Sequence, residues 1–316
     1  MDHKQTAYGV DVSAASLVIA TYEGDSLSEI ANTPEAISAW LTSLPEGSVV
    51  AMEATGRYHL VLAHLAQAAG LQVYVLNPQA LKHYAQAVGL RAKTDRVDAQ
   101  LIARYVVHER QKLRPWTAPA PQAEALSQLL QRRHALVNAR KALMQSLAGV
   151  SALKAERHAL LASMQRMIGR LELLIGQELA RTPELLALQR RLISIVGIGP
   201  IVAAGLVAAL SRLRFTRAES FIAYTGLDPR PDDSGTRRGR RRLTKHGPAL
   251  LRCLLYNAGM AASHSKLFRT HYAALLARGL QTTEAIVILG RKLARIAFAL
   301  YRSGQTFNPE RHLRAT

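Results

Sequence analysis

Hydrophobic and polar positions in the first third of the chain follow the periods of strands and amphipathic helices in turn. The pattern predicts four strands, with one helix between the third and fourth and another after the fourth. The strands are expected at Ala7–Ser13, Leu17–Tyr22, Ser48–Met52 and Leu71–Leu76, and the helices at Tyr58–Ala69 and Thr94–His108. The first two strands are joined by a three-residue turn and form a hairpin. This order predicts an α/β sheet with helices on its faces, in a domain over residues 1–114.

A proline-rich segment, Pro115–Pro121, ends this pattern, and apolar positions at helical spacing follow as far as residue 182. They form two narrow stripes, separated by a break near Gly149. The first stripe is Leu126, Leu130, Val137, Met144 and Leu147, and the second is Leu153, Leu160, Met164, Met167, Leu171 and Leu174. Narrow seams suit an antiparallel hairpin or a coiled coil. Residues 115–182 are therefore expected to form a hinge and a coiled-coil arm, which either stays internal or serves dimerisation.

The last section, residues 183–316, is predicted to be mainly helical. A Gly-Ile-Gly turn at Gly197 and Gly199 precedes an apolar helix at Ile201–Leu210. This arrangement is similar to a helix–hairpin–helix, whose backbone N–H groups can hold a DNA phosphate. A tight turn between helices also needs glycine, so a purely structural role is the alternative. A loop from Thr225 to about Gly247 and two or three helices ending near Gly304 complete the section.

The charge of the chain points to a polyanionic partner. The formal net charge is +19 and the isoelectric point is near 10.7. Each Lys or Arg that meets a phosphate releases counterions, so this excess favours nucleic acid. A membrane surface is the competing partner, but the basic residues are spread along the chain and no lipidation signal is present. DNA is therefore the expected partner.

Cysteine usage and hydropathy exclude several other classes. Cys253 is the single cysteine, so an intramolecular disulfide is excluded, and no Cys/His cluster has the spacing of a zinc site. The N-terminus lacks the charged and apolar sections of a signal peptide, and no uncharged apolar stretch reaches the length of a membrane span. We expect a cytoplasmic, nucleoid-associated protein without a membrane partner.

Four carboxylates occupy positions that suggest chemistry. Asp11 interrupts the first strand and Glu53 follows the third, where a buried charge is costly unless it is paired or bound to a metal. Asp95 and Asp98 are three residues apart at the start of a helix, so they share a face at the positive end of the helix dipole. Together, Asp11, Glu53, Asp95 and Asp98 could hold one or two Mg²⁺ ions that position a scissile phosphate.

Each carboxylate also has a structural explanation. Asp95 could be an ordinary first-turn residue of the helix, and Glu53 could cap the turn at Gly56. Asp98 could pair with Arg91 or Arg104. The functional interpretation is favoured because all four fall at element ends or interrupt apolar strands, within an order of elements like that of RNase H.

The loop after Thr225 combines a Ser-Gly pair with a run of positive charge. Ser234 could approach a phosphate closely, although Ser-Gly is also an ordinary turn pair and a serine hydroxyl needs activation to act as a nucleophile. The neighbouring charges could stabilise a phosphorane-like transition state, and a solvated loop is the alternative. They are Arg237, Arg238, Arg240, Arg241, Arg242 and Lys245.

These motifs, taken in order, resemble the DEDD insertion-sequence transposases of the IS-one-ten family. The resemblance covers essentially the whole chain. It rests on Gly9–Ser13, Met52–Gly56, Lys93–Ala99, Gly197–Pro200, Gly226–Pro229, Ser234-Gly235 and the arginines that follow. One departure is Pro248, where a polar residue is expected; it puts a contact there in doubt.

The resemblance implies a RuvC-like N-terminal domain, a coiled-coil arm and a C-terminal transposase domain. It implies that Asp11, Glu53, Asp95 and Asp98 bind Mg²⁺, for which Mn²⁺ can substitute, and that Ser234 forms a transient covalent bond to DNA. It also implies homodimers that pair into tetramers, with the carboxylates of one subunit meeting the serine of another. A noncoding bridge RNA that recognises donor and target DNA is implied by the resemblance alone.

Three other functions compete with such a recombinase. A RuvC-like junction nuclease would hydrolyse DNA with the carboxylates alone, so its activity would survive Ser234→Ala. An actin-like ATPase or sugar kinase also carries an Asp on its first strand, but the glycine-rich phosphate loops expected of it are missing from the sequence. A non-catalytic architectural DNA-binding protein would explain the charge and leave Asp11 and Glu53 without a role.

Overall fold

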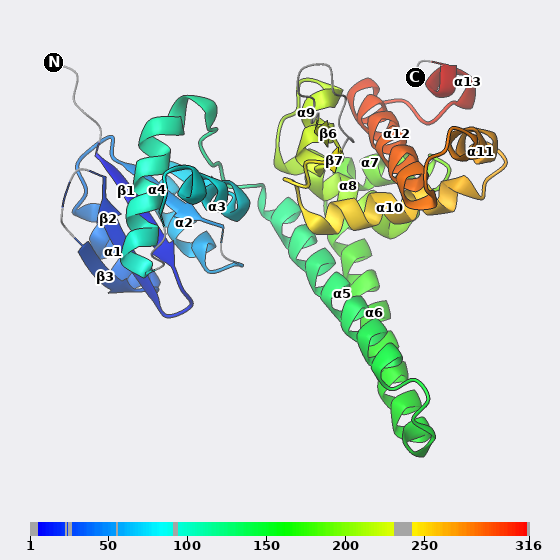
Figure 1. The fold of residues 1–316 in the computed structure, drawn as a ribbon, viewed down its shortest axis with the longest axis horizontal. Coiled ribbons are helices and arrows are strands. Elements are labelled where there is room, and N and C mark those ends of the chain that lie inside the picture. Colours follow the sequence, from blue (N-terminus) through cyan, green and yellow to red (C-terminus); the bar gives the residue numbers. More distant parts are fainter. Residues whose placement is uncertain are drawn as a thin grey trace. The chain divides into compact units, whose positions relative to one another are not determined.

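The computed structural model describes residues 6–22, 24, 27–54, 56–90, 94–230 and 242–314. The chain divides into two compact units, Met1–Ala118 and Pro119–Thr316 (Figure 1). Each unit has a hydrophobic core of its own. None of the described helices is both long and apolar enough to cross a membrane.

The first unit is built on a five-stranded mixed sheet with the order β3-β2-β1-β4-β5. The strands are β1 (Ala7–Val12), β2 (Ser16–Thr21), β3 (Leu27–Ala31), β4 (Val49–Glu53) and β5 (Gln72–Leu76). β1, β2 and β3 form an antiparallel meander, whereas β4 runs parallel to both β1 and β5. The predicted α/β class is therefore confirmed.

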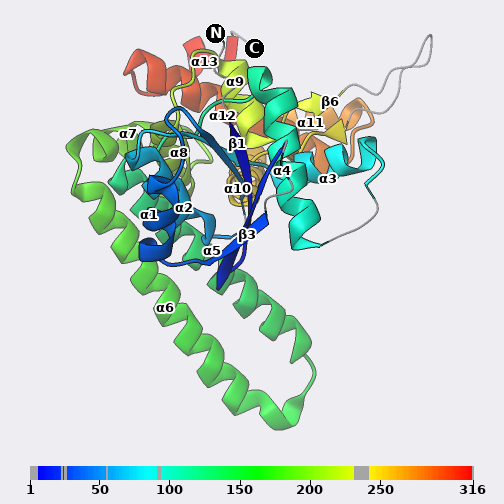
Figure 2. The same cartoon turned by 90° about the vertical axis from the view of Figure 1, so that its left-hand side faces the viewer.

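Helices cover both faces of this sheet, as Figure 2 shows. α1 (Pro34–Thr42) and α2 (His59–Ala68) pack on one face, against the side chains of Val10 and Met52. α3 (Pro78–Ala87) and α4 (Asp95–Glu109) pack on the other, against Ala7 and Ala51. Because side chains alternate along a strand, odd-numbered residues of β1 and β4 face α4 and even-numbered ones face α1 and α2. A short 3₁₀ turn, η1 (Arg110–Lys112), follows α4.

The sequence pattern missed three elements of this unit: β3, α1 and α3. β3 is an edge strand whose residues are mostly exposed, so it lacks a buried apolar face to reveal it. α3 buries only Leu81, and its other residues are exposed or half-buried. Both missed helices nevertheless carry a start signal, because Thr33 and Asn77 cap helices whose first residue is proline.

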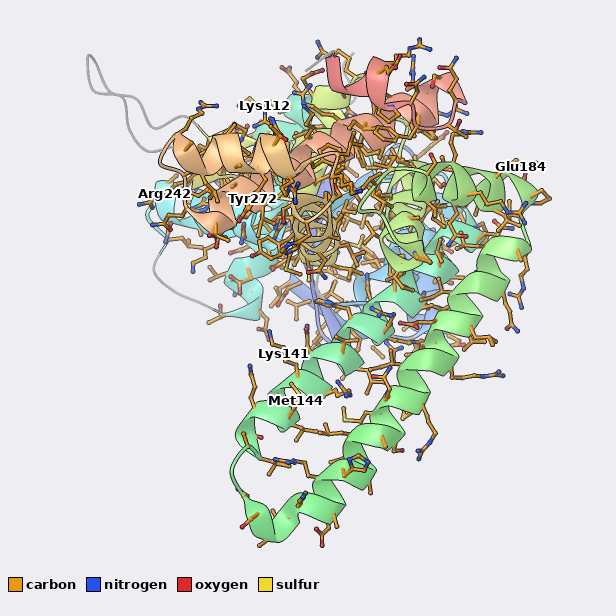
Figure 3. The ribbon with its side chains drawn as sticks, turned by 90° about the vertical axis from the view of Figure 1, so that its right-hand side faces the viewer. Lys112, Lys141, Met144, Glu184, Arg242 and Tyr272 are labelled. Carbon is orange, nitrogen blue, oxygen red and sulfur yellow. The ribbon has the colours of Figure 1, made fainter. Side chains whose placement is uncertain are left out.

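The second unit begins with a helical arm, formed by α5 (Pro121–Ser146) and α6 (Lys154–Ala180) with the 3₁₀ turn η2 (Ser151–Leu153) between them. The two long helices and the break near Gly149 agree with the predicted hairpin. Arg133 Nε donates to Glu172 Oε1 at 2.8 Å and ties the helices together across the seam. Figure 3 shows Lys141 and Met144 on the distal half of α5. Whether the arm also forms a coiled coil with a second chain stays a prediction.

The rest of the second unit is an all-helical body around α8 (Pro200–Arg212), whose residues from Ala203 to Leu210 are all buried. Around it lie α7 (Pro183–Ile193), α9 (Ala218–Thr225), α10 (Ala249–Ser263), α11 (Arg269–Ala277) and α12 (Thr282–Ser303), and α13 (Pro309–Arg314) lies near the C-terminus. A two-stranded ribbon, β6 (Pro229–Arg230) and β7 (Arg242–Leu243), interrupts the helices. The mainly helical character predicted for this section is confirmed.

Candidate active site

Asp11 and Glu53 are neighbours at the carboxyl ends of two parallel strands. Val10 of β1 lies opposite Met52 of β4, so the next residue of each strand is Asp11 and Glu53. Adjacent strands are separated by about 4.8 Å. Both residues are odd-numbered and therefore face α4, and both are half-buried. The fold thus brings two carboxylates that are 42 positions apart in the sequence to one place.

The direction of α4 decides where the other two carboxylates lie. At the C-terminal end of α4, His108 Nε2 is 2.9 Å from the hydroxyl of Tyr22, which follows β2 beside the start of β1. Arg110, just beyond α4, donates to Gln72 at the start of β5. The C-terminal end of α4 therefore lies over the amino ends of the parallel strands. Its first turn, which contains Asp95 and Asp98, lies at their carboxyl ends.

The start of α4 is fixed by a local cap. Thr94 Oγ1 accepts a hydrogen bond from the backbone N–H of Val97 at 3.3 Å, and the Thr94 carbonyl accepts one from the N–H of Asp98 at 2.9 Å. This confirms Thr94 as the predicted N-cap. Asp95 is exposed and Asp98 is half-buried. We call Asp11, Glu53, Asp95 and Asp98 the carboxylate edge.

The carboxylate edge offers only oxygen ligands, which are the ligands that Mg²⁺ and Mn²⁺ prefer. The donor chemistry therefore fits a divalent ion. The side chains do not converge, however: among the described residues, no three His, Cys, Asp or Glu side chains form a group that could hold a metal ion. The backbone brings the four residues to one edge, and an ion would have to draw their side chains together.

The predicted serine loop leaves and re-enters the second unit through a short ribbon. Pro229 pairs with Leu243 and Arg230 pairs with Arg242. Below this pair, the Thr244 N–H donates to the Asp228 carbonyl at 3.1 Å and the Thr244 hydroxyl donates to Asp228 Oδ1. We call residues 226–230 and 242–247 the loop stem.

Most of the predicted serine and arginine site falls between the two halves of the stem. Arg242 and Lys245 belong to the stem and are exposed, and Figure 3 labels Arg242. Lys245 adopts a left-handed backbone with φ 56°, which is uncommon for a residue with a side chain. The remaining predicted residues lie outside the described part of the chain: Ser234, Arg237, Arg238, Arg240 and Arg241.

The predicted glycine turn lies between α7 and α8. Gly197 has φ +95°, and a Cβ there would lie only 2.8 Å from the Ala258 carbonyl oxygen and the Ala262 Cβ of α10. Packing therefore explains Gly197 without any phosphate. Gly199 is exposed, has no atom near its Cβ position and is the N-cap of α8. A phosphate contact at Gly197 and Gly199 remains a prediction.

Sequence reasoning missed three arginines of α10 and α12. Arg252 of α10 donates to the Gly247 carbonyl, and Arg295 of α12 is paired with Glu219 of α9 at 3.1 Å. Arg291 lies one turn before Arg295 on α12 and is half-buried. Each arginine interrupts an apolar helix, and this is the same kind of signal that drew attention to Asp11 in β1.

Comparison with protein families identifies two families that match this chain. A DEDD transposase family matches residues 8–154, and the family described as "Transposase IS116/IS110/IS902 family" matches residues 189–273. The two matches reach into both units and include the carboxylate edge and the loop stem. The chain belongs to the IS110 (IS-one-ten) family of transposases. The predicted family and the predicted class of enzyme, a DNA transposase or recombinase, are thereby confirmed.

Individual relatives agree with this family. The pilin gene-inverting protein of Moraxella bovis is 29% identical over 269 residues, which is 83% of this chain and 82% of that protein. The transposase for insertion sequence element IS1111A of Coxiella burnetii is 26% identical over 302 residues, 84% of this chain and 81% of that protein. Among solved structures, T. thermophilus RuvC in complex with a Holliday junction substrate has 15% identity and a TM-score of 0.27, over 35% of this chain and 99% of that one.

Proposed function

We propose that this IS110-family transposase cuts and rejoins DNA strands through Ser234, with a divalent metal ion at the carboxylate edge. The observation that carries the proposal is the meeting of Asp11, Glu53 and the first turn of α4 at one edge of the sheet. Acidic residues from three separate elements meet there, and a DNA-processing enzyme needs a site for cations beside a phosphate.

At the carboxylate edge, Asp11 and Glu53 would hold the ion from the sheet, and Asp95 and Asp98 would hold it from α4. Mg²⁺, or Mn²⁺ in its place, supplies charge that offsets the developing negative charge on the phosphoryl oxygens. The protein contributes the position of the four carboxylates. Because β1 and β4 are buried strands of a packed sheet, their ends are fixed points for that purpose.

In the loop, the hydroxyl oxygen of Ser234 would bond to the phosphorus of the scissile phosphate, and the departing deoxyribose oxygen would take up a proton. Arg237, Arg238, Arg240, Arg241, Arg242 and Lys245 would stabilise the negative charge of the transition state. Rejoining reverses the step when the hydroxyl of another strand attacks the serine ester. The covalent intermediate conserves the bond energy that hydrolysis would lose, so no external energy source is needed.

The proposal also covers how the chains assemble and how the DNA sites are recognised. The apolar stripe of the arm leaves Met144, Leu160 and Met167 between 45% and 56% exposed. Such a stripe supports pairing with a second chain. We propose homodimers that pair into tetramers, donor and target DNA as substrates, and a noncoding bridge RNA as guide. The RNA rests on family resemblance alone.

The test is an excision assay on the native element with its flanking DNA, in which the circle junction is amplified from cells. Ser234→Ala and Glu53→Gln are each expected to abolish the junction. Ser28→Ala and Glu29→Gln, both exposed on β3, are the matched controls and should retain it. All variants are checked for expression and folding.

Junctions that persist in Ser234→Ala would contradict the nucleophile and favour a junction nuclease that uses the carboxylates alone. Junctions that persist in Glu53→Gln would contradict the metal site. If both variants keep wild-type levels, the proposed chemistry is wrong at both sites.

A further inference from the structure

The loop stem is hydrogen-bonded to α10, and α10 crosses α12 unusually closely. α10 and α12 are antiparallel where they meet: Gly259 lies against Ile286, and Gly290 lies against Leu255. A Cβ on Gly259 would be 2.4 Å from the Ile286 carbonyl oxygen, and one on Gly290 would be 2.6 Å from the Leu255 carbonyl oxygen. The two backbones therefore touch, which holds the flanking residues in fixed positions. Those flanking residues include Arg252, one turn before Leu255, and Arg291, next to Gly290.

Arg252 joins this crossing to the loop stem. Its guanidinium donates to the Gly247 carbonyl, and its Nη1 lies 3.0 Å from the position that a Cβ would occupy on Gly226. Gly226 and Gly247 belong to opposite halves of the stem. Arg252 thus hydrogen-bonds to one half of the stem and lies close to the other, and its hydrogen bond to Gly247 is structural.

Arg291 is different, because it has no ion-pair partner among the described residues. It is half-buried, and none of the acidic side chains in the described part of the chain forms an ion pair with it. Arg295, one turn later on the same face of α12, already has Glu219 as its partner at 3.1 Å. A partly buried cation that forms no ion pair is costly, so a bound anion would stabilise it.

The surroundings of Arg291 are consistent with an anion site near the stem. Burial lowers the pKa of the Arg291 guanidinium and Arg295 lowers it further, whereas Asp228 in the stem acts in the opposite direction. Asp228 also accepts the hydrogen bond from Thr244. From residue 242 to the end, the sequence has twelve Lys and Arg residues and only two acidic ones, Glu284 and Glu310. The local field therefore favours an anion.

We propose that Arg291 binds a backbone phosphate of the DNA strand held at the loop stem, and that Arg252 is a positioning residue for that stem. The planar guanidinium suits bidentate contact with phosphate oxygens. This inference rests on the proposed function, because it takes the strand at the stem to be the one that Ser234 attacks. It adds a phosphate-binding residue from α12, 57 positions after the serine in the sequence.

The test measures DNA binding without strand cleavage. Ser234→Ala protein is titrated with a fluorescent duplex of unrelated sequence at several salt concentrations, with and without Arg291→Gln. Loss of a charged hydrogen bond to phosphate is expected to weaken binding by about tenfold or more. The slope of log K against log salt should become shallower by about 0.9, the value for one phosphate contact. Arg302→Gln, an exposed arginine in the last turn of α12, is the control and should change neither quantity.

Two further variants separate binding from folding. Arg291→Lys keeps the charge, so it should retain the salt slope while losing part of the affinity. Arg291→Gln should melt at the same temperature as the parent or above it, because it removes a buried charge that has no ion-pair partner. Arg252→Gln should melt lower, because it loses the bond to Gly247.

Unchanged affinity and salt slope in Arg291→Gln would overturn the phosphate contact, as would an equal loss in Arg302→Gln. A lower melting temperature in Arg291→Gln that Arg291→Lys does not restore would assign the residue a structural role instead. These results are independent of whether Ser234 is the nucleophile, since the excision assay alone decides that.

Discussion

The contact between β1 and α4 offers the sharpest link between packing and chemistry. Gly9 lies two residues before Asp11 on the same face of β1, and α4 packs on it directly. A Cβ added at Gly9 would be 2.1 Å from the Ala99 carbonyl oxygen and 2.3 Å from the Ala103 nitrogen. Ordinary contact begins at 3.4 Å, so Gly9→Ala would force α4 away from the sheet by about 1.3 Å. Both obstructing atoms are backbone, and no side chain can rotate to relieve the clash.

The expected cost follows from that displacement. Overpacking a close-packed core typically destabilises a protein by about 1–3 kcal/mol. For a unit of this size, that corresponds to a melting temperature lower by roughly 4–12 °C. The same movement would carry Asp95 and Asp98 away from Asp11 and Glu53, and a misplacement of about 1 Å can lower a rate by roughly a hundredfold. Gly9→Ala should therefore lose recombination even at a temperature where it is folded.

Calorimetry and the excision assay measure the two effects, and hydrogen exchange of peptides from β1 and α4 assigns the unfolding to the first unit. Gly169→Ala is the matched control, because no atom lies within 4 Å of its Cβ position in α6. Helix propensity alone should stabilise that variant by up to about 1 kcal/mol. A Gly9→Ala protein with wild-type melting and wild-type excision would refute the argument that this contact sets the carboxylate edge.

Two further predictions concern pH and assembly. The pKa of His271 is lowered by burial, by Lys292 and by Arg278, so the imidazole binds a proton more readily in the unfolded chain than in the folded one. The free energy of unfolding should therefore fall as the pH drops below 6.5. Calorimetry at several pH values should show a smaller loss of stability at low pH in His271→Gln. A pH dependence unaltered by that substitution would contradict the assignment. In the arm, the double variant Leu160→Glu with Met167→Glu should weaken self-association, measured by light scattering at micromolar concentration. The control Lys141→Glu, on the same arm, should have less effect. Equal association of the parent protein, the double variant and the control would exclude the apolar stripe as the interface.

Local pattern was enough to predict much of the fold. β2 and β4 are buried on both faces and appear in the sequence as short apolar runs. The helices α2, α4, α5 and α6 bury one face each, and such a face leaves a trace at helical spacing. β3 and α3 left no such trace, because one is an exposed edge and the other buries a single leucine. Thr94 was identified because a capping residue acts on its own next turn.

The candidate site also has features that the sequence shows and features that only the tertiary structure sets. A charged residue inside an apolar strand is visible in the sequence, and so Asp11 and Glu53 could be selected one by one, as could the pair at Asp95 and Asp98. That they share an edge depends on the parallel pairing of β1 with β4 and on the antiparallel course of α4, which are long-range contacts. Likewise, the sequence shows Arg291 only as a charge that interrupts an apolar helix. The tertiary structure places it half-buried next to the close crossing of α10 and α12, without an ion-pair partner among the described residues, because proximity and burial are properties of the tertiary structure.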